Sequence, residues 1–177
     1  MVEAVRRAAR VLAVAPDLVM LGALGVALAK LNQKAKLTIQ MMVPQRDGPG
    51  ESDMVGLFAD QRLLDVLTED LSYAGVVLAL HHVVKERLWR VPPVLEQAAI
   101  PFVNFMWTDF EERHGFTQIV EEEFVQSGTQ NPVKITVDQP DKFSWRVKVG
   151  LDKSLYAEAD LNRFFQFLEE GLQLLMD

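Results

Sequence analysis

The sequence predicts a mixed α/β domain in which long helices cover a β-sheet. Apolar residues recur at helical spacing near both ends of the chain, and two neighbouring segments late in the chain alternate apolar and polar residues as strands do. Loops that contain Gly or Pro separate these segments. The 177 residues fit one domain, 1–177, that is long enough to bury a substantial core.

Two helices are predicted in the first 31 residues. Proline is accepted in the first turn of a helix but not in its interior, so Pro16 begins the second helix. The run LVMLGALGVALA at 18–29 is too short to span a bilayer, and we interpret it as a buried helix. Arg6, Arg7 and Arg10 precede apolar residues, as basic residues do in signal sequences. Glu3 and the lack of a clean cleavage pattern favour an ordinary amphipathic helix instead.

The middle of the chain predicts two strands and a helix. KLTIQMMVP at 36–44 is rich in strand-forming residues, and MVGLFADQRLLDVL at 54–67 begins in a loop and runs into a strand. Between 71 and 89, apolar residues lie three and four positions apart, which predicts a helix. Its buried face is expected to comprise Val76, Val77, Leu80, Val84 and Leu88.

The second half predicts further strands and a final helix. VPPVLEQA at 91–98 favours a short helix, IPFVNFMW at 100–107 a strand buried on both faces, and FTQIVEEEF at 116–124 another strand. The alternating segments at 132–138 and 142–152 predict an antiparallel hairpin, with Trp145 in the core. A last helix from about Asp160 carries an apolar stripe: Leu161, Phe164, Phe165, Leu168, Leu172 and Leu175.

Charge and composition exclude several functions. The net charge of −7 comes from acidic residues spread along the chain, so nucleic acid and anionic membrane surfaces are not expected partners. The absence of cysteine excludes disulfides, thiolate nucleophiles and cysteine-bound metal. We expect a cytoplasmic protein, because the lack of cysteine is compatible with a reducing compartment.

The histidine pair in VVLALHHVVKERLW is the first candidate for catalysis, because a doubled histidine occurs in the acyl-transfer signature H-H-x-x-x-D-G. On a helix, however, neighbouring side chains point about 100° apart, so His81 and His82 cannot both face one substrate. The next positions, 85–87, are Lys, Glu and Arg, with no glycine to make a turn. We interpret them as helix-surface histidines, with His81 near the edge of the packed face and His82 on the wetter side.

No metal site is expected either, since His114 has only sequence proximity to Glu111 and Glu112. The phosphate-binding motifs and the G-x-S-x-G motif are also missing from the sequence.

Several segments, taken in order, resemble a known family. VGLFADQRLLDV is similar to the IGxFVNTxxxR segment in the C-terminal half of nonribosomal peptide synthetase condensation domains, which belong to the chloramphenicol-acetyltransferase-like superfamily. RVPPVLEQ resembles xVPFExL, AAIPFVNFMW resembles NPLFQVxFxF, and residues 142–175 resemble the family's closing strand and helix. Residues 14–47 are similar to the helix and strand that end in a family Gly-Arg pair, which places Arg46 at that arginine.

The resemblance implies one lobe of a CoA-dependent acyltransferase-like fold, namely the C-terminal lobe of a condensation domain. The catalytic H-H-x-x-x-D-G motif belongs to the N-terminal lobe, which this chain lacks, so the chain is expected to have no catalytic residue and to be inactive alone. In the family, an amine attacks an acyl thioester held by phosphopantetheine on a carrier domain. The implied partners are therefore the N-terminal lobe and acyl or peptidyl carrier domains, and no cofactor is bound directly.

The resemblance also implies a set of tunnel or loop contacts. Gly56 and Phe58 match the family pattern, whereas Asp60 and Gln61 stand where the family often has Asn and Thr, and Asp65 replaces a common arginine. The full set of expected contact residues is Arg46, Gly56, Phe58, Asp60, Gln61, Arg62 and Asn104.

Two alternatives stay open. One is a non-catalytic scaffold or interaction subunit built on the same lobe. The other is an independent acyltransferase that uses His81, His82 or His114.

Overall fold

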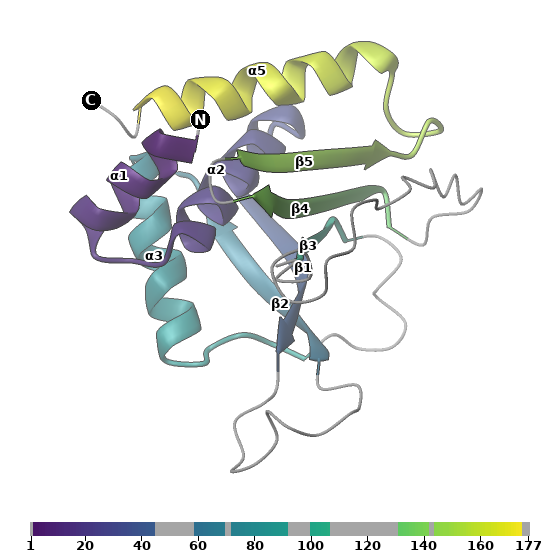
Figure 1. The fold of residues 1–177 in the computed structure, drawn as a ribbon. Helices are drawn as coiled ribbons and strands as arrows, with labels where there is room; N and C mark the ends of the chain where they lie inside the picture. Colours follow the sequence, from purple (N-terminus) through teal and green to yellow (C-terminus); the bar gives the residue numbers. More distant parts are fainter. Residues whose placement is uncertain are drawn as a thin grey trace, which may run out of the picture.

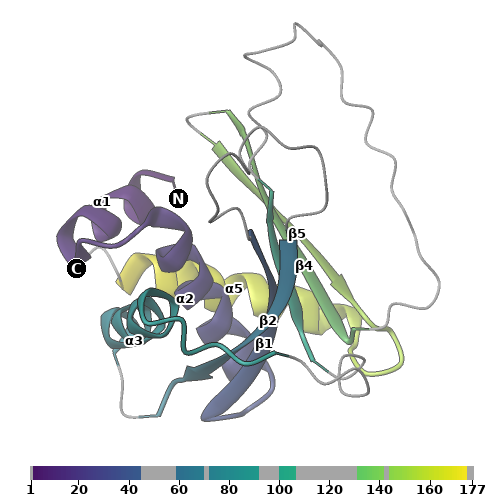
Figure 2. The same ribbon diagram turned by 90° about the horizontal axis from the view of Figure 1, so that it is seen from below.

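The computed structural model describes residues 2–44, 59–69, 72–91, 100–106, 131–141 and 144–174. In this part of the chain, helices cover one face of a mixed five-stranded sheet, as Figures 1 and 2 show, and the predicted α/β class is confirmed. The elements in chain order are α1 (Val2–Leu12), α2 (Pro16–Leu31), β1 (Lys36–Pro44), β2 (Ala59–Leu67), α3 (Tyr73–Lys85), β3 (Phe102–Met106), β4 (Val133–Asp141), β5 (Ser144–Leu151) and α5 (Glu158–Leu174).

The strands lie in the order β2-β1-β3-β4-β5. β1 pairs parallel with β3, and β3 with β4, whereas β2 and β5 run antiparallel to their neighbours. The predicted hairpin is β4 and β5, and Trp145 is buried as expected. On the outer edge of β2, Leu63 and Arg90 form an isolated antiparallel bridge, with N···O distances of 2.8 and 3.1 Å.

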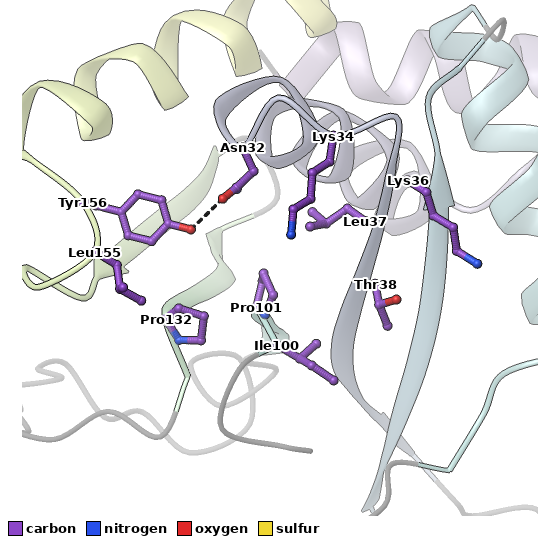
Figure 3. Close-up of a pocket in the computed structure, with 10 residues that line it drawn as sticks. All are labelled: Asn32, Lys34, Lys36, Leu37, Thr38, Ile100, Pro101, Pro132, Leu155 and Tyr156. Carbon is purple, nitrogen blue, oxygen red and sulfur yellow. Dashed lines mark hydrogen bonds between the residues drawn. The ribbon is translucent and has the colours of Figure 1, made fainter.

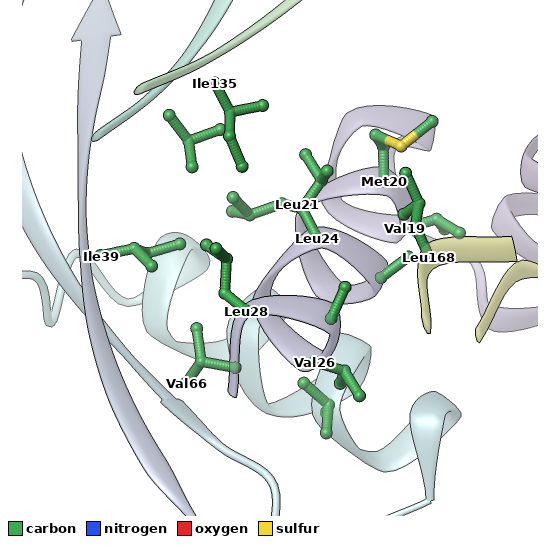
Figure 4. Close-up of a cluster of buried hydrophobic side chains, with 14 of the residues drawn as sticks. Val19, Met20, Leu21, Leu24, Val26, Leu28, Ile39, Val66, Ile135 and Leu168 are labelled. Atoms are coloured by element: carbon green, nitrogen blue, oxygen red, sulfur yellow. The ribbon is translucent and has the colours of Figure 1, made fainter. Parts of the chain in front are cut away.

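Helix α2 is the centre of the core (Figure 4). Every one of its residues from Leu18 to Leu31 is buried except Lys30, so the predicted buried helix is confirmed. Its leucines lie among Ile39 of β1, Ile135 of β4 and other apolar side chains of the sheet and helices. Full burial of one such side chain stabilises the fold by roughly 1.5–3 kcal/mol relative to exposure.

Helix α3 has the predicted face but ends earlier than expected. The Ser72 hydroxyl caps its N-terminus by accepting from the Gly75 backbone N–H at 3.1 Å. Val76, Val77 and Leu80 are buried as predicted. Leu88, which was expected on the same face, is 58% exposed, and this prediction is wrong. The reason is that α3 ends at Lys85 and the chain then turns through Arg87, whose φ is 54°.

Helix α5 confirms the predicted C-terminal stripe where it is described. Phe164, Leu168 and Leu172 are buried, and Phe165 packs edge-on against Phe164 with ring centroids 5.5 Å apart. Strand β3 is less enclosed than predicted, since Val103 is fully buried but Phe102 and Asn104 are half-buried. Apart from Val91, the helix expected at 91–98 lies outside the described residues, as does the strand expected at 116–124.

No single described helix is long and apolar enough to cross a membrane. α1 and α2 reach that length and hydropathy only together, and they are bent by 107° relative to each other.

Candidate functional site

The candidate site is the face of the sheet that points away from the described helices (Figure 2). Successive side chains of a strand point to opposite faces. Ile39, Val66, Val103 and Ile135 point into the helical layer and are fully buried, so their neighbours along each strand point the other way. We call this second surface the polar face; it comprises Thr38, Gln40, Met42, Gln61, Leu63, Asp65, Phe102, Asn104, Lys134, Thr136, Asp138, Arg146 and Lys148.

Strand register brings two predicted contact residues, Gln61 and Asn104, into one row across the polar face. Gln61 is paired with Met42, and Asn104 with Thr136. The pairing of Gln40 with Phe102 places Met42 level with Asn104. Lys148, the partner of Thr136, completes the row on β5. The row therefore crosses all five strands of the sheet.

Three side-chain amides form a chain of hydrogen bonds on this face. Asn131 Nδ2 donates to Gln40 Oε1 at 3.4 Å and to the carbonyl oxygen of Ile100 at 2.8 Å. Gln40 Nε2 in turn donates to Gln61 Oε1 at 2.5 Å. Gln40 is 1% exposed and is the one buried polar side chain in the described part of the chain. A buried amide is costly unless it is hydrogen-bonded, so this arrangement satisfies Gln40 on both sides.

Gln61 stands at the end of this series of hydrogen bonds. Asn131 donates to Gln40, and Gln40 donates to Gln61. The Gln61 Nε2 group itself makes no hydrogen bond within the described residues. Hydrogen bonds in such chains polarise one another, which strengthens the terminal donor. The Gln61 Nε2 group is therefore the terminal donor of this series of hydrogen bonds within the described residues.

Asp65 gathers three donors at the β2 end of the polar face. It accepts from Thr38 Oγ1 at 2.8 Å and lies 2.9 Å from both Lys36 Nζ and a guanidinium nitrogen of Arg90. Burial raises the pKa of the Asp65 carboxyl, but the bonds from Lys36, Thr38 and Arg90 outweigh it and hold that pKa below its ordinary value of 3.8. The cluster ties β1, β2 and the Arg90 segment together.

Asp60 and Arg62 do not join Gln61 on the polar face. Because residues 60–62 are consecutive in β2, Asp60 and Arg62 share the side of Leu64 and Val66, which faces the helices. A guanidinium nitrogen of Arg62 contacts the Asp60 carboxylate and donates to the Gln61 carbonyl oxygen at 2.9 Å. The bond from Arg62, together with the Gln61 backbone N–H, lowers the pKa of Asp60. Of these three consecutive residues, Gln61 alone therefore points to the polar face.

The histidine pair lies on the helical side of the sheet. Both residues belong to α3, with His81 half-buried and His82 exposed, as predicted. Among the remaining candidates, Arg46, Gly56, Phe58 and His114 lie outside the described residues. Within those residues, no three His, Asp or Glu side chains are grouped so that they could hold a metal ion.

Sequence reasoning missed Gln40 and Asn131. In KLTIQMMVP, Gln40 occupies a position that alternation alone assigns to a solvent-facing side chain. Nothing in the sequence indicates that Asn131, 91 residues away, donates to it.

Comparison with known proteins identifies the fold. No protein-family model matches the sequence, and no curated protein sequence matches it. Among solved structures, 99% of the chain matches 39% of the condensation domain that mediates chain release from the enacyloxin polyketide synthase, with a TM-score of 0.73 and 14% identity. It also matches 45% of an epimerization domain of tyrocidine synthetase B, with a TM-score of 0.70 and 12% identity over 99% of the chain.

A third match is an acyl transferase. The chain matches 42% of the PapA2 acyl transferase, with a TM-score of 0.64 and 10% identity over 99% of its own length. In all three cases it spans less than half of the solved chain. The protein thus has the fold of one lobe of a condensation domain, and the resemblance seen in the sequence is confirmed.

Proposed function

We propose that the chain is the C-terminal lobe of a condensation-type acyltransferase. Such an enzyme forms an amide or ester bond between a carrier-tethered acyl thioester and an acceptor. One observation supports this most directly: 99% of the chain aligns with only 39% of a condensation domain, which is the extent of one lobe. The lobe contributes a tunnel wall and a surface for carrier docking, and it is inactive alone.

In this proposal the polar face is the tunnel wall. Its central row offers the Gln61 and Asn104 side chains to a substrate, and the amide chain from Asn131 through Gln40 orients Gln61. A donor held in this way can position a thioester or amide carbonyl before reaction. Holding two tethered reactants in line is a proximity effect, which removes a large share of the activation barrier of a bimolecular reaction.

The chemistry itself belongs to the partner lobe. A histidine of its H-H-x-x-x-D-G motif would position or deprotonate the attacking amine. His81 and His82 of this chain lie on α3, on the other side of the sheet from the polar face, and take no part. Phosphopantetheine stays attached to the carrier domains, so the lobe needs no cofactor of its own. Arg46, Gly56 and Phe58 would contribute further loop contacts.

The test is native purification of the tagged chain followed by mass spectrometry of the intact complex. A partner that carries H-H-x-x-x-D-G, with condensation activity only in the complex, is the expected result. A stable assembly with no such motif and no carrier domain would overturn the proposal in favour of a non-catalytic scaffold.

A matched pair of variants locates the interface. Thr136→Arg places a long cation in the central row of the polar face and should abolish recovery of the partner. Glu169→Arg introduces the same side chain at an exposed position of α5 and should leave recovery unchanged. Equal recovery with both variants would show that the polar face is not the contact surface.

A further inference from the structure

A cleft of about 600 Å³ lies at one end of the sheet (Figure 3). Because β1, β3 and β4 run parallel, their amino ends meet there, and the antiparallel strand β5 finishes beside them. The turn after α2 and the segment after β5 complete the walls. Pro44 and Ala59 pair at the opposite end of the sheet, so the cleft is separate from Asp60 and Gln61, which follow Ala59 in β2.

Lys34 supplies the charge in the cleft. Its ammonium group points into the space between Tyr156, Leu37 and Pro101 (Figure 3). It makes no ion pair with a carboxylate in the described part of the chain. The other lysine of the wall, Lys36, points away from the cleft and is 2.9 Å from Asp65. Among the residues that the structure describes, Lys34 is thus a cation without an ion-pair partner, in a protein whose net charge is −7.

The carboxylates near the cleft have partners of their own. Asp65 is neutralised by Lys36 and Arg90. Asp160 lies 2.6 Å from a guanidinium nitrogen of Arg163 and accepts from the Ala157 backbone N–H at 2.8 Å. The charges of these two carboxylates are therefore already paired with cations.

The other polar groups of the wall are bonded to each other. The Tyr156 hydroxyl donates to Asn32 Oδ1 at 2.9 Å, and Asn32 Nδ2 donates to the Leu28 carbonyl oxygen at 2.8 Å. Burial, and to a lesser degree the charge of Asp160, raises the pKa of Tyr156 above 10.0, so its hydroxyl stays neutral at pH 7. The Tyr156 ring therefore serves as a wall and Lys34 is left as the donor for a ligand.

The remaining surface of the cleft is apolar. Pro101 is buried and Ile100 and Pro132 are half-buried, while Leu155 at the rim is 66% exposed. A leucine this exposed beside a cleft gains by being covered, since burial of apolar surface is favourable. The volume lies within the range of small-molecule sites, which are mostly apolar with a few polar groups that fix orientation.

We propose that this cleft binds a small amphipathic carboxylate, with its charged head on Lys34 and its apolar body against Ile100, Pro101 and Leu155. The inference does not depend on the proposed function, because the cleft lies within this lobe.

Hexanoate is the probe, and binding is followed by chemical-shift changes in the ¹⁵N-labelled chain. Amide signals of residues 32–38, 100 and 155–156 should shift saturably. Acetate, which has the charge without the apolar body, and hexanol, which has the body without the charge, should each bind at least fivefold more weakly. Equal binding of hexanol, or shifts confined to other residues, would overturn the proposal.

Variants separate the role of Lys34 from general charge. Lys34→Gln should weaken hexanoate at least fivefold, and Lys34→Arg should keep its affinity within about twofold, because it retains the charge. Lys153→Gln removes one positive charge at another exposed position and should change nothing. If Lys34→Gln and Lys153→Gln bind hexanoate equally well, Lys34 is not the anion site.

Discussion

Gly22 of α2 lies directly against Val77 of α3: a Cβ atom at Gly22 would stand 2.6 Å from Val77 Cγ2. Gly22→Ala should therefore destabilise the protein, although alanine favours helix by about 1 kcal/mol over glycine. Overpacking a well-packed core costs roughly 1–3 kcal/mol, and here it would also force α3 to shift. We therefore expect a net loss of about 1 kcal/mol in the free energy of unfolding. Urea denaturation measures it.

The control is a double-mutant cycle with Val77→Ala, which removes the methyl group that the new Cβ would meet. In that background Gly22→Ala should be neutral or stabilising, because the steric conflict is gone and the helix propensity remains. A Gly22→Ala variant more stable than the unaltered chain would mean that α2 and α3 are farther apart than described.

Gln40→Leu should destabilise the fold even though leucine suits a buried strand. The change removes the donor to Gln61 Oε1 and the acceptor of the Asn131 Nδ2 bond, at a cost of about 1–3 kcal/mol. In the Gln40→Leu background, Gln61→Leu should lower the free energy of unfolding by about 1 kcal/mol less than it does in the unaltered chain, because the interaction between the two side chains is already lost. Strictly additive losses in chemical denaturation would contradict the amide chain.

Asp65→Asn should remove a pH-dependent part of the stability. The folded-state pKa of Asp65 lies below its ordinary value of 3.8, so its carboxylate stabilises the fold above that value and the contribution is lost as pH falls through the folded pKa. At pH 7 we expect a loss of roughly 1 kcal/mol, modest because the pairs with Lys36 and Arg90 are partly solvated.

The comparison of Asp65→Asn with the unaltered chain should be repeated during acid titration of the unfolding free energy. The difference between the two proteins should be constant above about pH 5 and should shrink below pH 4. A difference that grows on acidification would show that the carboxylate is not stabilised in the folded state.

His82→Ala should leave the free energy of unfolding within about 0.5 kcal/mol, as for most exposed substitutions. It should also leave the turnover of any active complex unchanged, because His82 is on α3 rather than on the polar face. Loss of turnover with intact stability would revive the independent acyltransferase alternative.

Features that depend on local pattern were predictable from the sequence. Pro16 marks the start of α2, and the alternation in β4 and β5 predicts their pairing, because both signals act within a few residues. The end of α3 was not predictable in this way. Arg87 adopts a positive φ without being Gly or Asn, so the turn that exposes Leu88 has no residue signature.

The candidate site depends on register between distant segments. Gln61 and Asn104 are 43 positions apart in number, and only the pairing of β2 with β1 and of β1 with β3 puts them in one row. The family pattern points to residues of the 54–67 segment as contacts. It could not separate Gln61 from Asp60 and Arg62, because strand parity decides the face of each side chain.

The bridge between Leu63 and Arg90 limits where another strand can be added to this sheet. The Arg90 backbone already occupies hydrogen-bonding groups of Leu63 on the outer edge of β2. At the other end of the sheet, β5 is the terminal strand in the described part of the chain. A strand donated by a second polypeptide would therefore join along Ser144–Leu151, and pairing between two such edges would stop at a dimer because no second open edge remains among the described strands for further addition.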